Sequence, residues 1–251
     1  MKLFKIIFLL FTLLSSCIIN AQQKGIWDYP GKPGLWDYPV KPGTEEWKQF
    51  KSHEEKRSAC QIPEELLSSL STDDLADLCM RYPLLGDILA FDNKNSALDK
   101  LFRDFNGIRE LYKRKDVSSN LNGRYTDKIQ SFSFLNGSST SLEKGFFLLS
   151  VDVLELLLSR IDNNGSEDKK VLKEVLQNLV TGYEKRFNYH DYFKGGFKSN
   201  FFARANIIAK IDSAFIDSLP NKELNFVFNS GWVYDEETLR IIDQFSYRLI
   251  K

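Results

Sequence analysis

One segment near the middle of the chain is apolar on almost every side of the helix that it would form. It follows Ser141, and most of its residues from 146 to 158 are phenylalanine, leucine or valine. A helix that is apolar nearly all round must be surrounded by other elements or by lipid. Asp152 and Glu155 interrupt the run, which argues against a membrane span. We therefore predict that this segment is a buried helix of a helical protein.

The rest of the sequence after Gly43 also carries helical patterns. Apolar residues recur at helical spacing, and Thr44, Ser71 and Ser96 are suitable N-cap residues. Gly107 predicts a kink, and the polar residues 130–140 predict a surface loop. The main segments expected to be helical are 44–59, 71–82, 96–111, 116–123, 141–162, 167–188, 200–219 and 235–249. The pattern predicts an all-α fold for residues 44–251, a single multi-helix array of roughly eight to ten helices with antiparallel sequential neighbours.

The first residues have the features of a secretory signal. Lys2 and Lys5 precede an uncharged apolar run over residues 6–14. A short apolar run after a basic start is typical of a signal peptide. A membrane-spanning helix needs roughly 20 apolar residues, a length that this run approaches only if it continues to Ile19. We expect export, with a retained N-terminal anchor as the less favoured alternative.

Two cleavage sites compete at the end of this signal. Residues 14–17, Leu-Ser-Ser-Cys, resemble the bacterial lipobox, so that cleavage would remove residues 1–16 and leave a lipid on Cys17. Residues 19–21, Ile-Asn-Ala, resemble an ordinary signal peptidase site, which would remove residues 1–21. Ile18 and Ile19 are unusual at the start of a mature lipoprotein. We favour the lipid anchor and keep the soluble alternative open.

Residues 22–43 contain a nine-residue unit that is copied almost intact. Gly-Ile-Trp-Asp-Tyr-Pro-Gly-Lys-Pro at 25–33 is followed by Gly-Leu-Trp-Asp-Tyr-Pro-Val-Lys-Pro at 34–42. Because proline lacks an amide donor and fixes φ, the segment cannot be a helix or a central strand. We interpret it as a semi-rigid stalk. In two alternatives its aromatic residues dock back on the domain or bind a partner or a sugar face; these residues are Trp27, Tyr29, Trp36 and Tyr38.

Charge and cysteine content limit the class of protein. Lys+Arg and Asp+Glu number 34 each, so the chain lacks the basic excess of a nucleic-acid binder, and we expect no nucleic-acid partner. The odd count of three cysteines is awkward in an oxidising compartment. If Cys17 takes a lipid, Cys60 and Cys79 remain. They form either a disulfide, worth roughly 3 kcal/mol for a loop of about 20 residues, or two buried thiols.

No residue stands out as catalytic, and we expect neither a metal nor a cofactor. His190 precedes Asp191 in a loop rich in aromatic residues and glycine, but no serine elbow or catalytic-cysteine context accompanies it. His53 lies among charged residues and is expected to be solvated. The acid pairs at 64–65 and 73–74 are explained by helix capping. Zinc-ligand spacings and phosphate-binding glycine loops are absent from the sequence.

Several short segments in order along the chain carry a resemblance. They are Cys-Gln-Ile-Pro-Glu-Glu-Leu-Leu at 60–67, Ser-Thr-Asp-Asp-Leu at 71–75, Tyr-Pro-Leu at 82–84, Phe-Asn-Gly at 105–107 and Glu-Leu at 110–111. This set resembles a group of uncharacterised exported bacterial proteins. The resemblance implies a helical domain behind a signal peptide, and it implies no catalytic residues because no activity is established for that group.

The sequence therefore predicts an exported cell-envelope protein. We expect a non-enzymatic binding or structural module on a stalk, with an unidentified protein or glycan as its partner. A lipid on Cys17 would hold it to a membrane, in the periplasm or at the cell surface; without the lipid it would be a soluble periplasmic or secreted protein. The alternative function is an extracytoplasmic hydrolase that acts on glycan or peptide.

Overall fold

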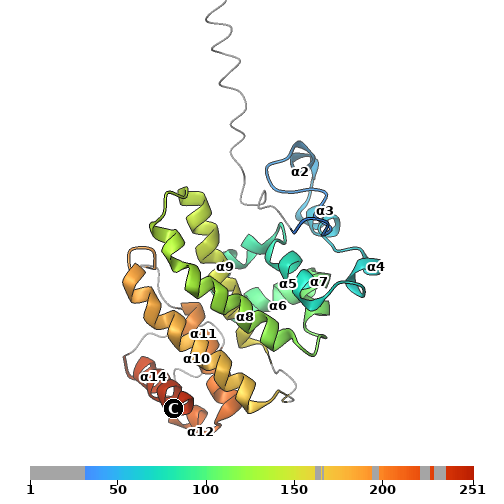
Figure 1. Cartoon of the computed structure of the whole chain (residues 1–251). Helices are drawn as coiled ribbons and strands as arrows, with labels where there is room; N and C mark the ends of the chain where they lie inside the picture. The colour runs from blue at the N-terminus through green and yellow to red at the C-terminus, as the bar shows by residue number, and fades with distance from the viewer. Residues whose placement is uncertain (1–31, 162–164, 166, 194–197, 221–226, 229–235) are drawn as a thin grey trace, which may run out of the picture.

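The computed structural model describes residues 32–161, 165, 167–193, 198–220, 227–228 and 236–251 (Figure 1). Over these residues the protein contains no strand, and eight α-helices have seven or more residues. The predicted all-α fold class is confirmed. Within the same ranges, no helix combines the length and the apolar character that crossing a bilayer requires. Cys17, Trp27 and Tyr29 lie outside the described residues.

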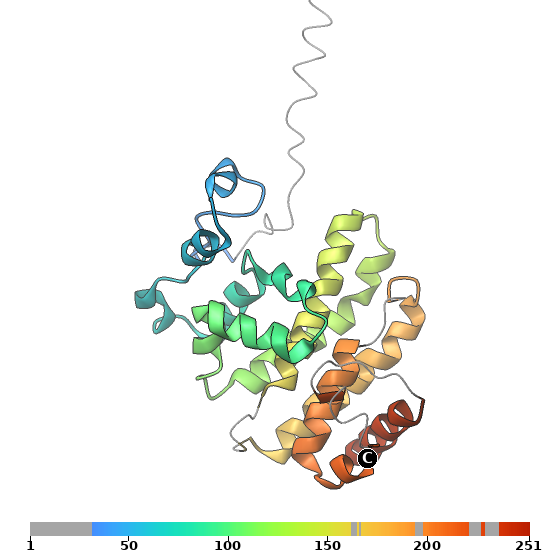
Figure 2. The same cartoon turned by 180° about the vertical axis from the view of Figure 1, so that it is seen from behind.

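The apolar segment forms helix α9 (Ser141–Ser159) at the centre of a group of long helices. Its first turn has a reciprocal capping box, in which Thr140 Oγ1 accepts from the Glu143 amide and the Glu143 carboxylate accepts from the Thr140 amide. Two long helices pack on α9, and two more complete the group (Figure 2). They are α8 (Val117–Gln130) and α11 (Lys198–Ile211) on α9, then α10 (Lys169–Arg186) and α14 (Glu236–Ile250).

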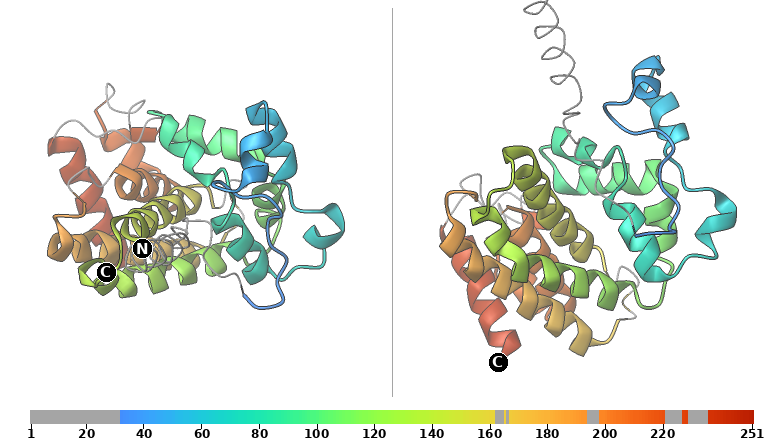
Figure 3. Two further views of the ribbon diagram at one scale, coloured as in Figure 1. Left: turned by 90° about the horizontal axis from the view of Figure 1, so that it is seen from above. Right: turned by 45° about the horizontal axis from the view of Figure 1, so that its top comes forward.

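Shorter helices from the N-terminal part lie at one side of α8 and α9 (Figure 3). They are α2 (Glu45–Gln49), α3 (His53–Ala59), α4 (Glu64–Leu67), α5 (Thr72–Met80), the 3₁₀ helix η2 (Leu85–Ala90), α6 (Lys94–Asp104) and α7 (Asn106–Leu111). Asp104 joins two of them, since its carboxylate pairs with Lys100 of α6 and, at 3.1 Å, with Arg57 of α3. Burial acts to raise the pKa of Asp104, but these two cations outweigh burial and hold it at about 2.

The structure differs from the sequence prediction in several segments. Residues 44–59 form two helices, because Ser52 accepts a hydrogen bond from the Glu55 amide and so caps a second helix. Helix α8 continues past residue 123 to Gln130, and its residues spaced four apart, Leu121, Tyr125 and Ile129, are buried. Residues 200–219 contain α11 and a separate short helix, α12 (Ala214–Ser218).

The prediction of a surface loop at 130–140 is also wrong for the first half of that segment. Residues Ser131–Asn136 form a 3₁₀ helix, η3, in which Phe132 and Leu135 are buried. Side chains three residues apart line up on one face of a 3₁₀ helix. Of the serines that made this segment look solvated, Ser131 and Ser133 therefore flank the core residue Phe132.

The kink predicted at Gly107 lies instead at Phe105, two residues earlier in the chain. Helix α6 ends at Asp104, Phe105 is extended, and α7 begins at Asn106. A Cβ added to Gly107 would lie 2.5 Å from Phe105 Cζ and 2.9 Å from Ile62 Cδ1. Glycine is therefore required by close packing at this position.

A charged cluster lies in the core where α8, α9, α10 and α11 meet. Glu155 and Arg186 are fully buried and form an ion pair of 2.5 Å. The Glu155 carboxylate also accepts hydrogen bonds from Tyr125 (2.7 Å), Asn200 (2.8 Å) and Ser199 (2.6 Å). Such bonds offset the desolvation cost of a buried charge. One carboxylate on α9 therefore ties together side chains from the three helices around it.

Ser199 also contacts a second acid in this cluster, Asp152. Its Oγ lies 2.6 Å from Glu155 Oε2 and 2.7 Å from Asp152 Oδ1. Burial, reinforced by the charge of Glu155, raises the pKa of Asp152. Ser199 therefore links the carboxyl groups of Asp152 and Glu155 on α9.

Candidate functional site

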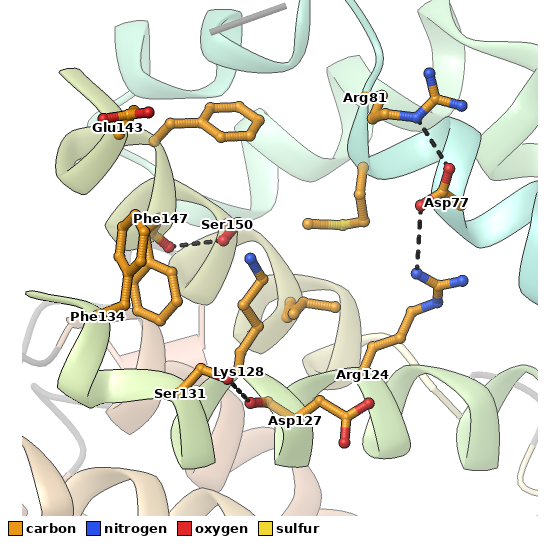
Figure 4. Close-up of a pocket in the computed structure, with 13 residues that line it drawn as sticks. Asp77, Arg81, Arg124, Asp127, Lys128, Ser131, Phe134, Glu143, Phe147 and Ser150 are labelled. Atoms are coloured by element: carbon orange, nitrogen blue, oxygen red, sulfur yellow. Dashed lines mark hydrogen bonds and ion pairs between the residues drawn. The ribbon is translucent and has the colours of Figure 1, made fainter. Parts of the chain in front are cut away.

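A cavity of about 430 Å³ lies between the N-terminal helices and the group of long helices. Its walls come from the end of α5, from α8, from η3 and from the first half of α9 (Figure 4). Ligand cavities in proteins have volumes of about 300–1,000 Å³ and combine apolar walls with a few polar groups. This cavity meets both criteria.

One side of the cavity is apolar. Phe134 of η3 and Phe147 of α9 are stacked with their ring centroids 5.3 Å apart. Met80, Phe146 and Leu154 extend this surface. These residues come from η3, α9 and α5, and helix α8 packs against both α9 and α5. The apolar wall can hold an aromatic or aliphatic group by burying it from water.

The opposite side carries two arginines that are already paired with acids. Arg81 Nε lies 2.9 Å from Asp77, and its Nη1 lies 2.9 Å from Asp37. Arg124 pairs with Asp73 at 2.5 Å and lies 3.9 Å from Asp77. The positive charge of each arginine is therefore balanced within the protein.

Lys128 differs from these arginines because it has no acidic partner among the described residues. Figure 4 shows its side chain rising from α8 into the cavity, toward Phe147 and Ser150 on α9. The amine lies 4.8 Å from the centroid of the Phe147 ring, a cation–π contact. Burial, with a smaller contribution from the charge of Arg124, lowers the pKa of Lys128. Lys128 is therefore the one cation in the described lining that forms no ion pair, although the carboxylates of Asp127 and Glu143 also line the cavity.

The other polar groups in the cavity wall make local hydrogen bonds. Ser131 donates to the backbone carbonyl of Asp127, and Ser150 donates to that of Phe147. Glu143 belongs to the capping box of α9. The described lining contains neither histidine nor cysteine. Neither serine is thus held by a side-chain base, as nucleophilic catalysis requires.

The second copy of the aromatic repeat docks on the body beside this cavity. Tyr38 is 3% exposed, and its hydroxyl donates to the carbonyl of Leu78 in α5 at 2.9 Å. Trp36 contacts the Tyr38 ring edge-on at 5.0 Å and packs against the core. Asp37 reaches Arg81 in the cavity wall. In the part of the repeat that the structure describes, Trp36, Asp37 and Tyr38 therefore contact the helical body.

In the structure, the two described cysteines are separate thiols and do not form a disulfide. Cys60 and Cys79 are free and buried. Burial raises the pKa of Cys60 to about 12 and raises that of Cys79 further still. A thiol with a raised pKa remains protonated and unreactive at neutral pH. The disulfide stays a prediction for the oxidised protein.

The histidines considered from the sequence lie in open positions. The His190 side chain is 76% exposed, and its Nε2 is 3.7 Å from Asp191. His53 is half-exposed and lies 2.7 Å from Asp87. Among the residues that the structure describes, no group of three or more histidine, cysteine or acidic side chains could hold a metal ion. Neither histidine is enclosed with other reactive groups.

The acid pair at 73–74 serves capping and ion pairing. Ser71 Oγ accepts from the Asp74 amide. Lys32 pairs with both acids, and Arg124 pairs with Asp73. The hydrogen bond from Lys32 is the main cause of the lowered pKa of both Asp73 and Asp74. These carboxylates are charged at neutral pH and are unsuited to donate a proton. Glu64 and Glu65 lie in the first turn of α4, as the capping interpretation requires.

Sequence analysis did not identify the cavity residues. The signal that could have indicated them is the position of Lys128 between Tyr125 and Ile129, two core residues of the same helix face. Comparisons of the chain with protein families, with curated proteins and with solved structures give no match.

Proposed function

We propose that this protein is an exported, non-enzymatic binding module of the cell envelope, and that it holds a small ligand in the cavity between α5, α8 and α9. The observation that carries the proposal is the cavity itself, which joins an apolar wall to one lysine without an acidic partner in the described part of the chain. A site of this composition binds and orients a ligand. The part of the repeat beside the cavity helps to shape it, because Asp37 of the repeat forms an ion pair with Arg81 in the cavity wall.

We propose the cellular location of the protein from its N-terminal signal sequence. The basic and apolar start, followed by the lipobox at 14–17, supports export and a lipid on Cys17. Incorporation of radiolabelled palmitate tests the lipid anchor. Wild-type protein should be labelled and recovered with membranes, whereas the Cys17→Ala variant should carry no label. Unlabelled wild-type protein would favour cleavage after Ala21 and a soluble product.

The binding proposal is tested by filling the cavity. Met80 lies in its wall at the end of α5. Met80→Trp should occupy the volume that a ligand needs, and Met80→Leu is the matched control because it conserves size and apolar character. The probes are 3-phenylpropionate and its neutral analogue 3-phenyl-1-propanol, and the measurement is isothermal titration calorimetry.

Wild type and Met80→Leu should bind at least one probe, and Met80→Trp should bind neither. Circular dichroism should show that all three proteins have the same helix content. Absence of heat from both probes with wild type, or equal binding by Met80→Trp, would contradict a ligand site in this cavity.

A further inference from the structure

We infer that the ligand of this cavity is a small amphiphile with a single negative charge, whose carboxylate pairs with Lys128 and whose apolar part lies against Phe134 and Phe147. This inference rests on the proposed function and specifies the ligand of the same site. It assigns Lys128 as the residue that selects the ligand by charge.

The charge of the ligand follows from the ion pairs in the cavity wall. Arg81 and Arg124 are each balanced by aspartates within bonding distance, as described above. Lys128 has a ring contact but no acid pair among the described residues. An ammonium group withdrawn from water without a counter-charge is costly. A ligand carboxylate would remove that cost, whereas a ligand ammonium would add repulsion from Lys128.

The apolar part of the ligand follows from the wall that faces Lys128. The stacked rings of Phe134 and Phe147 lie at one side, and Met80 and Leu154 continue the surface. Aromatic groups pack favourably against such rings. A sugar that lay against this wall would place hydroxyl groups opposite apolar atoms, where they would lose hydrogen bonds to water. The composition of the wall therefore favours an aromatic or acyl group over a glycan.

The size of the ligand follows from the cavity volume. At about 30 Å³ for each water-sized group, the 430 Å³ of the cavity hold roughly fourteen non-hydrogen atoms. That volume fits an aromatic acid or a medium-chain acyl acid. A folded partner or a glycan chain is too large to enter it. The single spare cation matches one carboxylate better than a doubly charged phosphate.

The test compares three probes that share one phenylpropyl group and differ in charge. They are 3-phenylpropionate, 3-phenyl-1-propanol and 3-phenylpropylamine, and the measurement is the dissociation constant by calorimetry at low salt. Wild type should bind the carboxylate about tenfold or more tightly than the alcohol. The amine should bind most weakly.

Variants at position 128 separate charge selection from binding itself. Lys128→Met keeps an apolar stem of similar length and should remove the preference for the carboxylate, while the alcohol binds as before. Lys128→Arg should retain the preference. Lys144→Met is the matched control, since Lys144 is also a lysine in a cation–π contact, 5.5 Å from the Tyr192 ring, but does not line the cavity. It should bind all three probes like wild type.

The outcomes distinguish the two proposals. Equal affinity of wild type for the carboxylate and the alcohol, or a preference that survives in Lys128→Met, would overturn the inference about the ligand and leave a neutral binding site. If wild type binds none of the three probes, both the ligand class and the cavity-based function are contradicted.

Discussion

Replacing Glu155 with leucine should be one of the most destabilising single changes in this protein. The carboxylate is fully buried, 2.5 Å from Arg186, and accepts further hydrogen bonds from Tyr125, Ser199 and Asn200. Glu155→Leu leaves the guanidinium of Arg186 buried without its closest counter-charge. Removing one member of a buried ion pair costs about 3–5 kcal/mol. A domain of ordinary stability has about 5–15 kcal/mol in total, so the loss is easy to measure.

A double-mutant cycle separates the ion pair from the loss of packing. Arg186→Met keeps most of the apolar stem, and the double variant Glu155→Leu/Arg186→Met removes both charges together. The double variant should be more stable than the sum of the single effects predicts, by about 1–3 kcal/mol, because neither charge is left alone. The assay is urea unfolding followed by circular dichroism at pH 7. Single variants that each lose less than about 1 kcal/mol, with effects that simply add, would refute the role assigned to this pair.

Three further changes test the packing and the electrostatics. Gly182→Ala should destabilise the protein by about 1–3 kcal/mol in urea unfolding, because its Cβ would lie 2.1 Å from the Tyr125 hydroxyl; an unchanged midpoint would contradict that packing. Tyr38→Phe removes the hydrogen bond to Leu78 and should cost about 1 kcal/mol by thermal unfolding, whereas no loss would indicate that the repeat is not docked. Asp104 has a folded pKa of about 2, below its ordinary 3.8. The ionised Asp104 carboxylate should add roughly 1 kcal/mol to the free energy of unfolding after solvent screening. This stabilisation should be complete above about pH 4 and should be lost as pH falls through 2. Asp104→Asn should be less stable than wild type at pH 7, and this difference should shrink as pH falls through 2.

The fold class can be predicted from the helical spacing of apolar residues, because that spacing is set by residues that lie close together in the sequence. Thr44 and Ser71 cap helices as expected, each accepting from the amide three residues on. Errors arise where a tertiary contact decides. Phe132 and Leu135 turn an apparently polar loop into a buried 3₁₀ helix. Their two apolar side chains face the core only because α8 extends far enough to place them there.

The cavity could not be predicted because its residues come from four elements whose packing against one another the sequence pattern does not give. Met80 is on α5, Lys128 is on α8, Phe134 is on η3 and Leu154 is on α9. Sequence gives the face of each helix but not the partner that it meets. Likewise, the repeat predicts an extended segment, but the docking of Tyr38 depends on the carbonyl of Leu78.

A crystal structure of the wild-type protein with 3-phenylpropionate tests the central claim most directly. The account predicts the phenyl group against Phe134 and Phe147, and the carboxylate at about 2.7–2.9 Å from the Lys128 amine, the usual length of a charged hydrogen bond. Arg81 and Arg124 should keep their pairs with Asp37 and Asp73. A probe bound elsewhere on the protein, or bound in the cavity with its carboxylate turned away from Lys128, would contradict the account.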